Sequence, residues 1–339
     1  MENTDIEYVH HSFSPWRGCT EIDAGCRFCF AKRGSDRNPR ILGKWGDAGS
    51  RVVASPKAWR EMRALDRKCG RMGIKQRVLC HWCDPFEDWT GPMIDHVGNR
   101  LEYCDQCHKV LWSFDKPCPC AKRFKRMATM HDVRHEYMMM IESCQNLIWL
   151  LTTKRPENIR SFWEGYAGFN IALGISVCNT ADALKKFDIF RDCMYLAETS
   201  WISAEPLIGA LDLVEARVLP RYECGTCGAV VTDYSHDSDD VCRTCESTMS
   251  FQFDCVDWLV VGGESGGRAR SCNPDWIRKI VRDCDRADVP CFVKQLGSNP
   301  DGVQVADPKG GNMDEWPKDL RVRQYPESFG DCNDAPTVV

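Results

Sequence analysis

Residues 147–156 read LIWLLTTKRP, and residues 258–267 read WLVVGGESGG. Each run starts with apolar residues and ends abruptly in polar residues or glycine, which is the pattern of a buried strand in a parallel sheet. Four further runs share this pattern: RVLCHWCDPFED (77–88), NIALGISVCN (170–179), WISAEPLIG (201–209) and PCFVKQLGSN (290–299). Together these runs predict the strands of one large α/β architecture.

Helix-like stretches lie between several of these strands. One runs from Thr180 to Cys193, where Asn179 or Thr180 can cap its start, and another runs from Pro274 to Ala287. Alternating strands and helices predict a parallel sheet with crossover helices. We therefore expect an α/β fold, namely a full or partial (β/α) barrel, with an open doubly wound sheet as the alternative.

Polar side chains follow the ends of these strands. In a β/α barrel the functional groups lie on the loops after the strands, so such residues are candidates for a shared site. Each could also be an ordinary helix cap or loop residue. The candidates are Asp84, Thr152, Thr153, Lys154, Ser176, Glu205, Glu264, Lys294 and Gln295.

A cluster of three cysteines lies near the N-terminus, in SPWRGCTEIDAGCRFCFAKR (14–33). Cys19, Cys26 and Cys29 have the spacing C-x6-C-x2-C. A structural zinc site normally takes four protein ligands, whereas a 4Fe-4S cluster held by three thiolates keeps one iron open for a substrate. The pattern favours an iron-sulfur cluster. Three unrelated thiols, or half of a zinc site, are the alternatives.

A second cysteine pattern occurs in ECGTCGAVVTDYSHDSDDVCRTCES (223–247). Its spacing is C-x2-C-x14-C-x2-C, which is typical of a zinc ribbon because each C-x2-C turn directs two thiolates at one tetrahedral ion. We expect a structural zinc ion here, and the ligands are Cys224, Cys227, Cys242 and Cys245.

A third pattern occurs in YCDQCHKVLWSFDKPCPC (103–120). Its second half is C-x-C, so a histidine could replace one thiolate, and His108, His131 and His135 are nearby. We expect a second structural zinc ion, held by Cys104, Cys107, Cys118 and Cys120.

Composition limits the classes of function. The chain has 339 residues, 22 cysteines and a formal net charge of −5. Bulk charge does not favour a protein that coats nucleic acid, but the segment 116–135 carries a local basic run that could meet a polyanion or simply be a solvated helix face. No run approaches the roughly 18 apolar residues of a membrane span, and so many cysteines without a signal peptide indicate reduced thiols in a cytoplasm.

The organisation expected along the chain follows from these patterns. The barrel is interrupted by two cysteine-rich inserts and ends in a tail rich in Pro, Asp, Gly and Asn. The expected segments are 1–100 (barrel half with the cysteine loop), 101–135 (zinc insert with the basic run), 136–220 (barrel), 221–250 (zinc ribbon), 251–320 (barrel) and 321–339 (flexible tail).

From His10 to Pro317 the motifs occur in a characteristic order. The series SPWRGCTEIDAGCRFCFAKR, LIWLLTTKRPENI, LGISVCN, WISAEPLIGALDL, WLVVGGESGGRARSCNPDWIRKI, CFVKQLG and MDEWP resembles the phage gene-product 37/68 family. That family is found in phage and bacterial genomes and is similar to radical S-adenosylmethionine (SAM) proteins. In radical SAM enzymes a GGE-like motif usually follows an early strand, whereas Gly262, Gly263 and Glu264 come late here.

The resemblance implies a radical SAM-type barrel in which Cys19, Cys26 and Cys29 hold a 4Fe-4S cluster that binds SAM. We assign catalytic roles to Glu205, Glu264 and Lys294. The cofactor-binding assignments are Asp84, Thr152, Thr153, Lys154, Ser176, Gly262 and Gly263. An electron donor is then a required partner, and the compartment is the cytoplasm, which is the host cytoplasm if a phage encodes the protein.

The phage-type family, the zinc modules and the basic run favour DNA as the substrate. Radical chemistry would modify or isomerise a base substituent, for example on a hypermodified thymidine, and so help viral DNA to evade host restriction. The alternative enzyme is a radical SAM lyase that repairs DNA lesions. The alternative outside catalysis is a zinc-ribbon adaptor for nucleic acid or protein.

Overall fold

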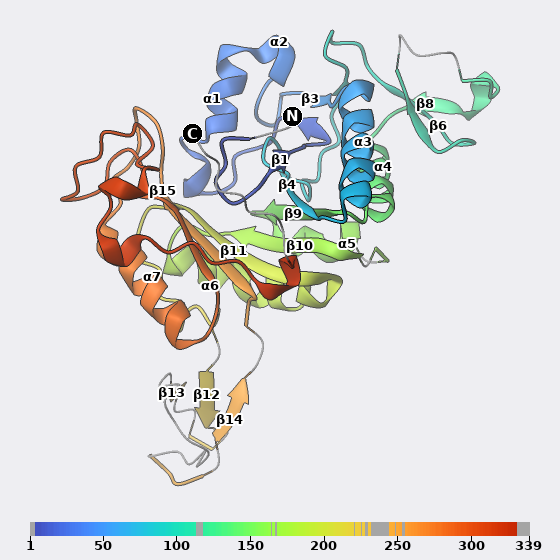
Figure 1. Cartoon of the computed structure of the whole chain (residues 1–339). Coiled ribbons are helices and arrows are strands. Elements are labelled where there is room, and N and C mark those ends of the chain that lie inside the picture. Colours follow the sequence, from blue (N-terminus) through green and yellow to red (C-terminus); the bar gives the residue numbers. More distant parts are fainter. Residues whose placement is uncertain are drawn as a thin grey trace. The chain divides into compact units, whose positions relative to one another are not determined.

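The computed structural model describes residues 4–112, 118–163, 165–166, 168–219, 221–224, 226–227, 230–231, 244–247, 249–252 and 255–330. Its main sheet has seven strands in the order β1-β4-β9-β10-β11-β15-β16 (Figure 1). The strands are β1 (His11–Ser12), β4 (Gln76–Leu79), β9 (Leu147–Thr153), β10 (Gly168–Ser176), β11 (Ala197–Leu207), β15 (Trp258–Gly263) and β16 (Cys291–Gln295).

The sheet confirms the predicted α/β class. Each of the six apolar runs overlaps one of its strands, and the four pairings described residue by residue, β1 with β4, β4 with β9, β11 with β15 and β15 with β16, are all parallel. Within the described residues β1 and β16 are the two ends of the strand order. The sheet is therefore consistent with a partial β/α barrel.

Both predicted crossover helices are present. Helix α6 (Thr180–Arg191) begins after Asn179, whose side chain accepts a hydrogen bond from the backbone N–H of Asp182 at 2.9 Å. Helix α7 (Pro274–Arg286) begins with its proline, after the cap Asn273. The other helices are α1 (Phe30–Arg37), α2 (Pro39–Leu42), α3 (Pro56–Met72), α4 (Met130–Ser143) and α5 (Ile159–Trp163).

The chain divides into two compact units, and the boundary lies within β10. Unit 1 comprises Met1–Leu173, Leu196–Glu198 and Phe329–Val339. Unit 2 comprises Gly174–Tyr195 and Thr199–Ser328. Short 3-10 helices occur in both units: η1 (Ala24–Cys26), η2 (Lys122–Phe124), η3 (Pro156–Asn158), η4 (Met194–Leu196), η5 (Met313–Glu315), η6 (Lys318–Leu320) and η7 (Glu327–Phe329).

The core of unit 1 is built around an aromatic cluster. Trp59 of α3 and Tyr137 of α4 make an edge-on contact with a centroid separation of 6.3 Å, and Tyr137 meets Trp149 of β9 at 5.7 Å. Phe13 contacts all three rings. Edge-to-face contacts of this kind add to the hydrophobic gain of burial, so the cluster fastens both helices to the strands.

Unit 2 has its own core. Helix α7 buries Ile277, Ile280 and Cys284, and contacts β15 and β16. The segment after Leu320, predicted as the start of a tail, pairs with β16: the Val293 N–H donates to the Val322 carbonyl at 2.8 Å, and the Gln324 N–H donates to the Cys291 carbonyl at 2.9 Å. The last predicted tail residues, 331–339, lie outside the described residues.

Three small sheets complete the fold. One has the order β2 (Trp16–Arg17), β3 (Arg51–Val53), β5 (Met93–Ile94) and lies in the N-terminal segment. The others belong to the cysteine-rich inserts: β7-β6-β8 is formed by Lys109–Leu111, Glu102–Cys104 and Lys125–Met127, and β13-β12-β14 is formed by Val230–Val231, Arg221–Cys224 and Met249–Gln252 (Figure 1).

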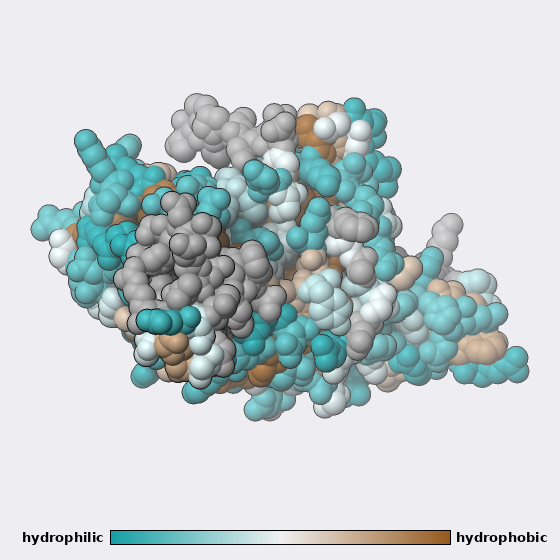
Figure 2. Space-filling model, turned by 90° about the horizontal axis from the view of Figure 1, so that it is seen from below, coloured by the Kyte–Doolittle hydropathy of each residue, from teal (hydrophilic) through white to brown (hydrophobic). Residues whose placement is uncertain are grey.

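The described surface is largely polar on the face drawn in Figure 2, where hydrophobic residues form only scattered spots. Among the described residues, none of the helices combines the length and the apolar character that a membrane crossing requires.

We predict that Trp149→Ala lowers the free energy of unfolding by about 3 to 5 kcal/mol, because it removes a fully buried ring from the aromatic cluster. Met72→Ala, at a residue 58% exposed at the end of α3, is the control and should cost less than about 0.5 kcal/mol. Urea unfolding followed by circular dichroism measures both. Equal midpoints for the two variants would contradict the assigned core.

Candidate functional site

The three-cysteine loop lies in unit 1 and is ordered by local contacts. The Asp23 carboxylate accepts a hydrogen bond from the Cys26 N–H at 3.2 Å and so caps η1, while Cys29 directly precedes α1. Gly18 has a φ of +109°, and a side chain there would meet the Ser50 carbonyl at 2.7 Å. The chain therefore needs glycine to enter the loop at this point.

The three thiols of the loop do not form a compact group. Cys19 is buried, Cys26 and Cys29 are partly exposed, and all three are free thiols. Among the described residues, the groups of at least three ligand atoms within 4.8 Å of one another are the two insert clusters, and the loop thiols do not form such a group. The loop sulfurs are thus spread more widely than those of the insert clusters.

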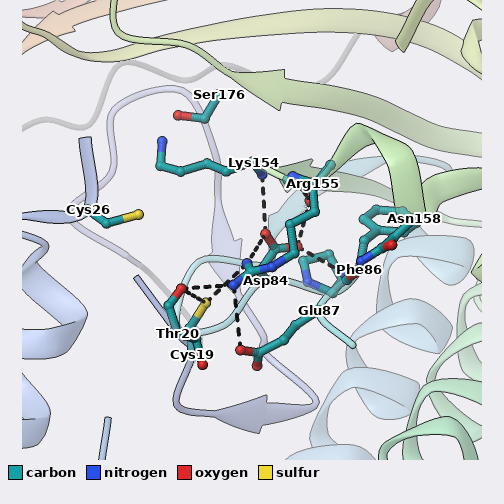
Figure 3. Close-up of polar contacts among 12 residues, drawn as sticks. Cys19, Thr20, Cys26, Asp84, Phe86, Glu87, Lys154, Arg155, Asn158 and Ser176 are labelled. Carbon is teal, nitrogen blue, oxygen red and sulfur yellow. Dashed lines mark hydrogen bonds and ion pairs between the residues drawn. The ribbon is translucent and has the colours of Figure 1, made fainter. Parts of the chain in front are cut away.

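A buried network of ion pairs and hydrogen bonds supports the cysteine loop. Arg155, two residues after β9, places one guanidinium nitrogen 3.5 Å from the Cys19 sulfur and 2.8 Å from the Asp84 carboxylate (Figure 3). Its other terminal nitrogen donates to the Thr20 carbonyl at 2.8 Å. Arg155 therefore connects the cysteine loop to the segment after β4.

A second guanidinium extends this network. Arg51, fully buried in β3, donates twice to Glu87, at 2.7 and 2.8 Å, and once to the Thr20 hydroxyl at 2.9 Å. Such a bidentate pair needs good geometry to offset the cost of burying two charges. Arg51 and Thr20 are residues that the sequence patterns missed, since a lone arginine at the start of a short strand carries no motif.

Asp84, a predicted cofactor-binding residue, is surrounded by protein hydrogen-bond donors. Its carboxylate accepts hydrogen bonds from the Thr153 hydroxyl at 2.7 Å and from the backbone N–H groups of Phe86 and Lys154 at 3.0 and 3.2 Å, in addition to Arg155. Both carboxylate oxygens are thus engaged by the protein. Asp84 and Thr153 organise the strand ends, while the neighbouring Thr152 hydroxyl is buried with no hydrogen-bond partner among the described residues.

Charged side chains of both signs act on the loop thiols. Burial raises the pKa of the Cys19 thiol, the Glu87 and Asp84 carboxylates raise it further, and Arg155 acts in the opposite direction. Burial likewise raises the pKa of Cys26, and the Lys154 ammonium opposes it; the Lys154 side chain extends toward Cys26 (Figure 3). Three thiolates on an iron-sulfur cluster form an anionic assembly, so the two cations fit such a group.

A second polar group lies in unit 2, within the last residues of strands β10, β11, β15 and β16. Lys294 makes an ion pair with Glu205 at 2.8 Å, and the Ser176 hydroxyl donates to the Glu205 carbonyl at 2.9 Å. A side chain at Gly262 would come within 3.1 Å of the Glu205 carboxylate. Of the unit 2 candidates, the structure therefore brings together Ser176, Glu205, Gly262 and Lys294.

Glu264 is engaged elsewhere in unit 2. Its two oxygens accept from the Arg270 side chain at 2.7 and 2.9 Å and from the Arg270 N–H at 2.9 Å, which closes the loop after β15. Gly263 allows the backbone to pass close to Leu296, whose carbonyl would be 2.2 Å from a side chain there. The Gln295 amide donates to the Gly263 carbonyl at 2.8 Å. These three residues shape the loop.

The first insert forms a four-thiol cluster. Cys104, Cys107, Cys118 and Cys120 place their sulfurs within 4.8 Å of one another, and the sulfurs of Cys107 and Cys118 are 3.6 Å apart. A Zn–S bond of about 2.3 Å sets two tetrahedral ligands about 3.8 Å apart. The four thiols could hold a metal ion without a histidine.

The second insert has three thiols in a similar arrangement. Cys224, Cys227 and Cys245 lie within 4.8 Å of one another, and the sulfurs of Cys224 and Cys245 are 3.4 Å apart. This group could also hold a metal ion. The fourth predicted ligand, Cys242, lies outside the described residues.

The basic run after the first insert is partly used within the protein. Arg126 forms ion pairs with Asp132 at 2.7 Å and Asp105 at 3.0 Å, and the Lys125 ammonium donates to the Cys118 carbonyl at 3.2 Å. Lys122 and Arg123 are exposed. The run therefore presents fewer cations than its sequence suggests.

The chain matches the model of a protein family described as "Protein of unknown function (DUF5131)" over residues 3–94 and 120–320, and it belongs to this family. No curated protein and no solved structure matches it. The family match is interrupted across residues 95–119, which contain Cys104, Cys107 and Cys118.

We predict that Glu87→Gln lowers the free energy of unfolding by about 3 to 5 kcal/mol, because Arg51 would remain buried without its carboxylate. Glu61→Gln is the matched control, since its pair with Lys57 is exposed and such pairs contribute about 0.3 to 0.5 kcal/mol. Thermal unfolding compares the two. A Glu87→Gln protein as stable as the control would show that the network does not support the loop.

We further predict that Cys107→Ser removes one equivalent of zinc from the purified protein, because a structural site needs all its ligands. Cys69→Ser, at a buried thiol of α3 outside both clusters, should leave the zinc content unchanged. Mass spectrometry of bound metals measures both. Unchanged zinc in the Cys107→Ser variant would refute this metal assignment.

Proposed function

We propose that this DUF5131 protein is an iron-sulfur enzyme of the radical SAM type. The observation that carries the proposal is the loop of three free thiols, Cys19, Cys26 and Cys29, whose sulfurs are spread more widely than those of the insert clusters and which lies beside Arg155 and Lys154. These thiols would hold a 4Fe-4S cluster. When bound, such a cluster and SAM supply the abstraction of a hydrogen atom from an unactivated carbon.

The residues around the loop would have supporting roles. Lys154 would offset part of the charge of the thiolates, Arg155 would donate a hydrogen bond to the Cys19 sulfur, and the Arg51–Glu87 pair would keep the loop in place. Asp84 and Thr153 would position Arg155 through their hydrogen bonds. The binding role predicted for Asp84 is thereby replaced by a positioning role.

The polar group of unit 2 would act on substrate or SAM. Lys294 can meet a carboxylate or phosphate, and Glu205 can accept a hydrogen bond from an amino group or ribose hydroxyl, provided that a ligand replaces part of their ion pair. Ser176 would hold the backbone of Glu205. Glu264, already paired with Arg270, would contribute through the shape of its loop.

For the substrate we propose a base in phage DNA, in line with the family resemblance of the motifs. The reaction would rearrange a substituent on a hypermodified thymidine and so help viral DNA to evade restriction. The two thiol clusters support a polymer target, because zinc modules commonly grip nucleic acid or protein. A base within a duplex would have to be flipped out to be reached.

The test is anaerobic purification followed by metal analysis and incubation with SAM and dithionite. We expect about four irons per chain and the formation of 5′-deoxyadenosine. Cys26→Ala should lose the iron and keep the zinc, whereas Cys107→Ala should lose zinc and keep the iron. A colourless protein that contains only zinc after cluster reconstitution, and cleaves no SAM, would overturn the proposal and favour the adaptor function.

A further inference from the structure

Unit 1 contains a pocket of about 520 Å³ that is separate from the cysteine loop. Its walls come from the segment after β4, the base of the first insert, the first turns of α4, and α5. The volume is in the range of small-molecule sites, roughly 300 to 1,000 Å³. The side chains that matter for its chemistry are Trp89, Arg100, His131, Arg134 and Phe162.

Arg134 is a buried cation in this wall, with a relative exposure of 3%. It donates to the carbonyls of Pro85, at 2.8 Å, and Glu87, and its guanidinium lies 3.9 Å from the centre of the Phe162 ring. Among the described residues, no carboxylate forms an ion pair with it within 4 Å, although Asp88 lies at the same pocket. Burying an unpaired charge is costly, so this guanidinium favours an anionic ligand.

The start of α4 adds to this preference. The N-cap Thr129 and the first helical residues Met130 and His131 line the pocket at the start of the 14-residue helix α4, whose dipole attracts anions. Thr129 and Asp132 accept each other's backbone N–H in a capping box. The negative charge of Asp132 in this turn is paired with Arg126 at 2.7 Å. Arg100 adds a further cation on the exposed side.

The remaining walls include two aromatic side chains, Trp89 and Phe162. The Trp89 ring lies 3.8 Å from the guanidinium of Arg51, and Gly91 leaves room for the indole, because a side chain there would be 2.2 Å from it. Phe162 is held in the same way by Arg134. Aromatic walls beside cations are typical of sites that stack a nucleobase and hold its phosphate.

We propose that this pocket binds a nucleotide, with the phosphate at Arg134 and the start of α4 and the base against Trp89 and Phe162. The nucleotide could be free or part of a single strand, since both present the same groups. This inference deepens the proposed function, on which its choice of a nucleic acid substrate rests, but the binding itself needs no cluster.

The test is calorimetric titration of the full chain with thymidine 5′-monophosphate, thymidine, inorganic phosphate and single-stranded oligothymidylate. We expect the monophosphate to bind at least tenfold more tightly than thymidine or phosphate alone. If the oligonucleotide binds more tightly than the monophosphate, the ligand of the pocket is a nucleic acid strand. If the two bind equally, the ligand is a free nucleotide. Equal affinities for thymidine and its monophosphate, or no binding of any probe, would overturn the proposal.

Variants test whether nucleotide binding depends on this pocket or on the general charge of the protein surface. Arg134→Lys should weaken monophosphate binding at least tenfold, and Arg100→Gln several-fold. Lys122→Gln, which removes one exposed charge outside the pocket, is the matched control and should bind normally. If the Arg134→Lys protein fails to fold, monophosphate binding by the variant at the exposed Arg100 provides the test. Normal binding by Arg100→Gln would then contradict the proposal. Cys26→Ala should bind the monophosphate as tightly as the unaltered protein. Loss of SAM cleavage therefore tests the iron-sulfur proposal, and loss of nucleotide binding tests the pocket proposal.

Discussion

The buried network of Arg51, Glu87, Arg155 and Asp84 is the constraint on which the candidate site depends. It joins β3, the segment after β4 and the end of β9, and it reaches the cysteine loop at Thr20 and at the Cys19 sulfur. Two guanidinium groups and two carboxylates balance each other's charge, so the network can exist in a low-dielectric interior only as a complete set. The loop is therefore positioned by protein contacts, whether or not a ligand is present.

The fold was largely predictable from the sequence because its strands are buried on both faces. Leu147–Leu151 and Trp258–Gly263 are continuous buried runs, which leave a clear pattern. The cap of α6 and the starting proline of α7 were also readable, because both are local signals. The insert clusters were readable from spacing alone, because two cysteines in one tight turn already share a direction.

The roles of single polar residues were less predictable. Asp84 and Glu264 follow strands and Glu205 lies near the end of one, but the structure engages Asp84 with protein donors, pairs Glu264 with Arg270, and leaves Glu205 in an ion pair with Lys294. A strand-end position indicates where a carboxylate lies and not what it binds. Arg51 and Arg134 could not be predicted at all, because their burial results from partners 36 and 47 to 49 positions away in the chain.

The interrupted family match bears on how function is divided within unit 1. The cysteine loop, the ion network, Arg134 and Phe162 lie in the matched segments, whereas Arg100 and Leu101, which close the pocket from the insert side, lie in the unmatched residues 95–119. The chemistry proposed for the loop would then belong to the shared family pattern. The insert completes one wall of the proposed nucleotide pocket. A change in the insert would therefore alter which ligand the pocket holds without altering the three thiols of the N-terminal cysteine loop. Recognition and reaction can diverge separately in such an arrangement, because different segments of the chain carry them.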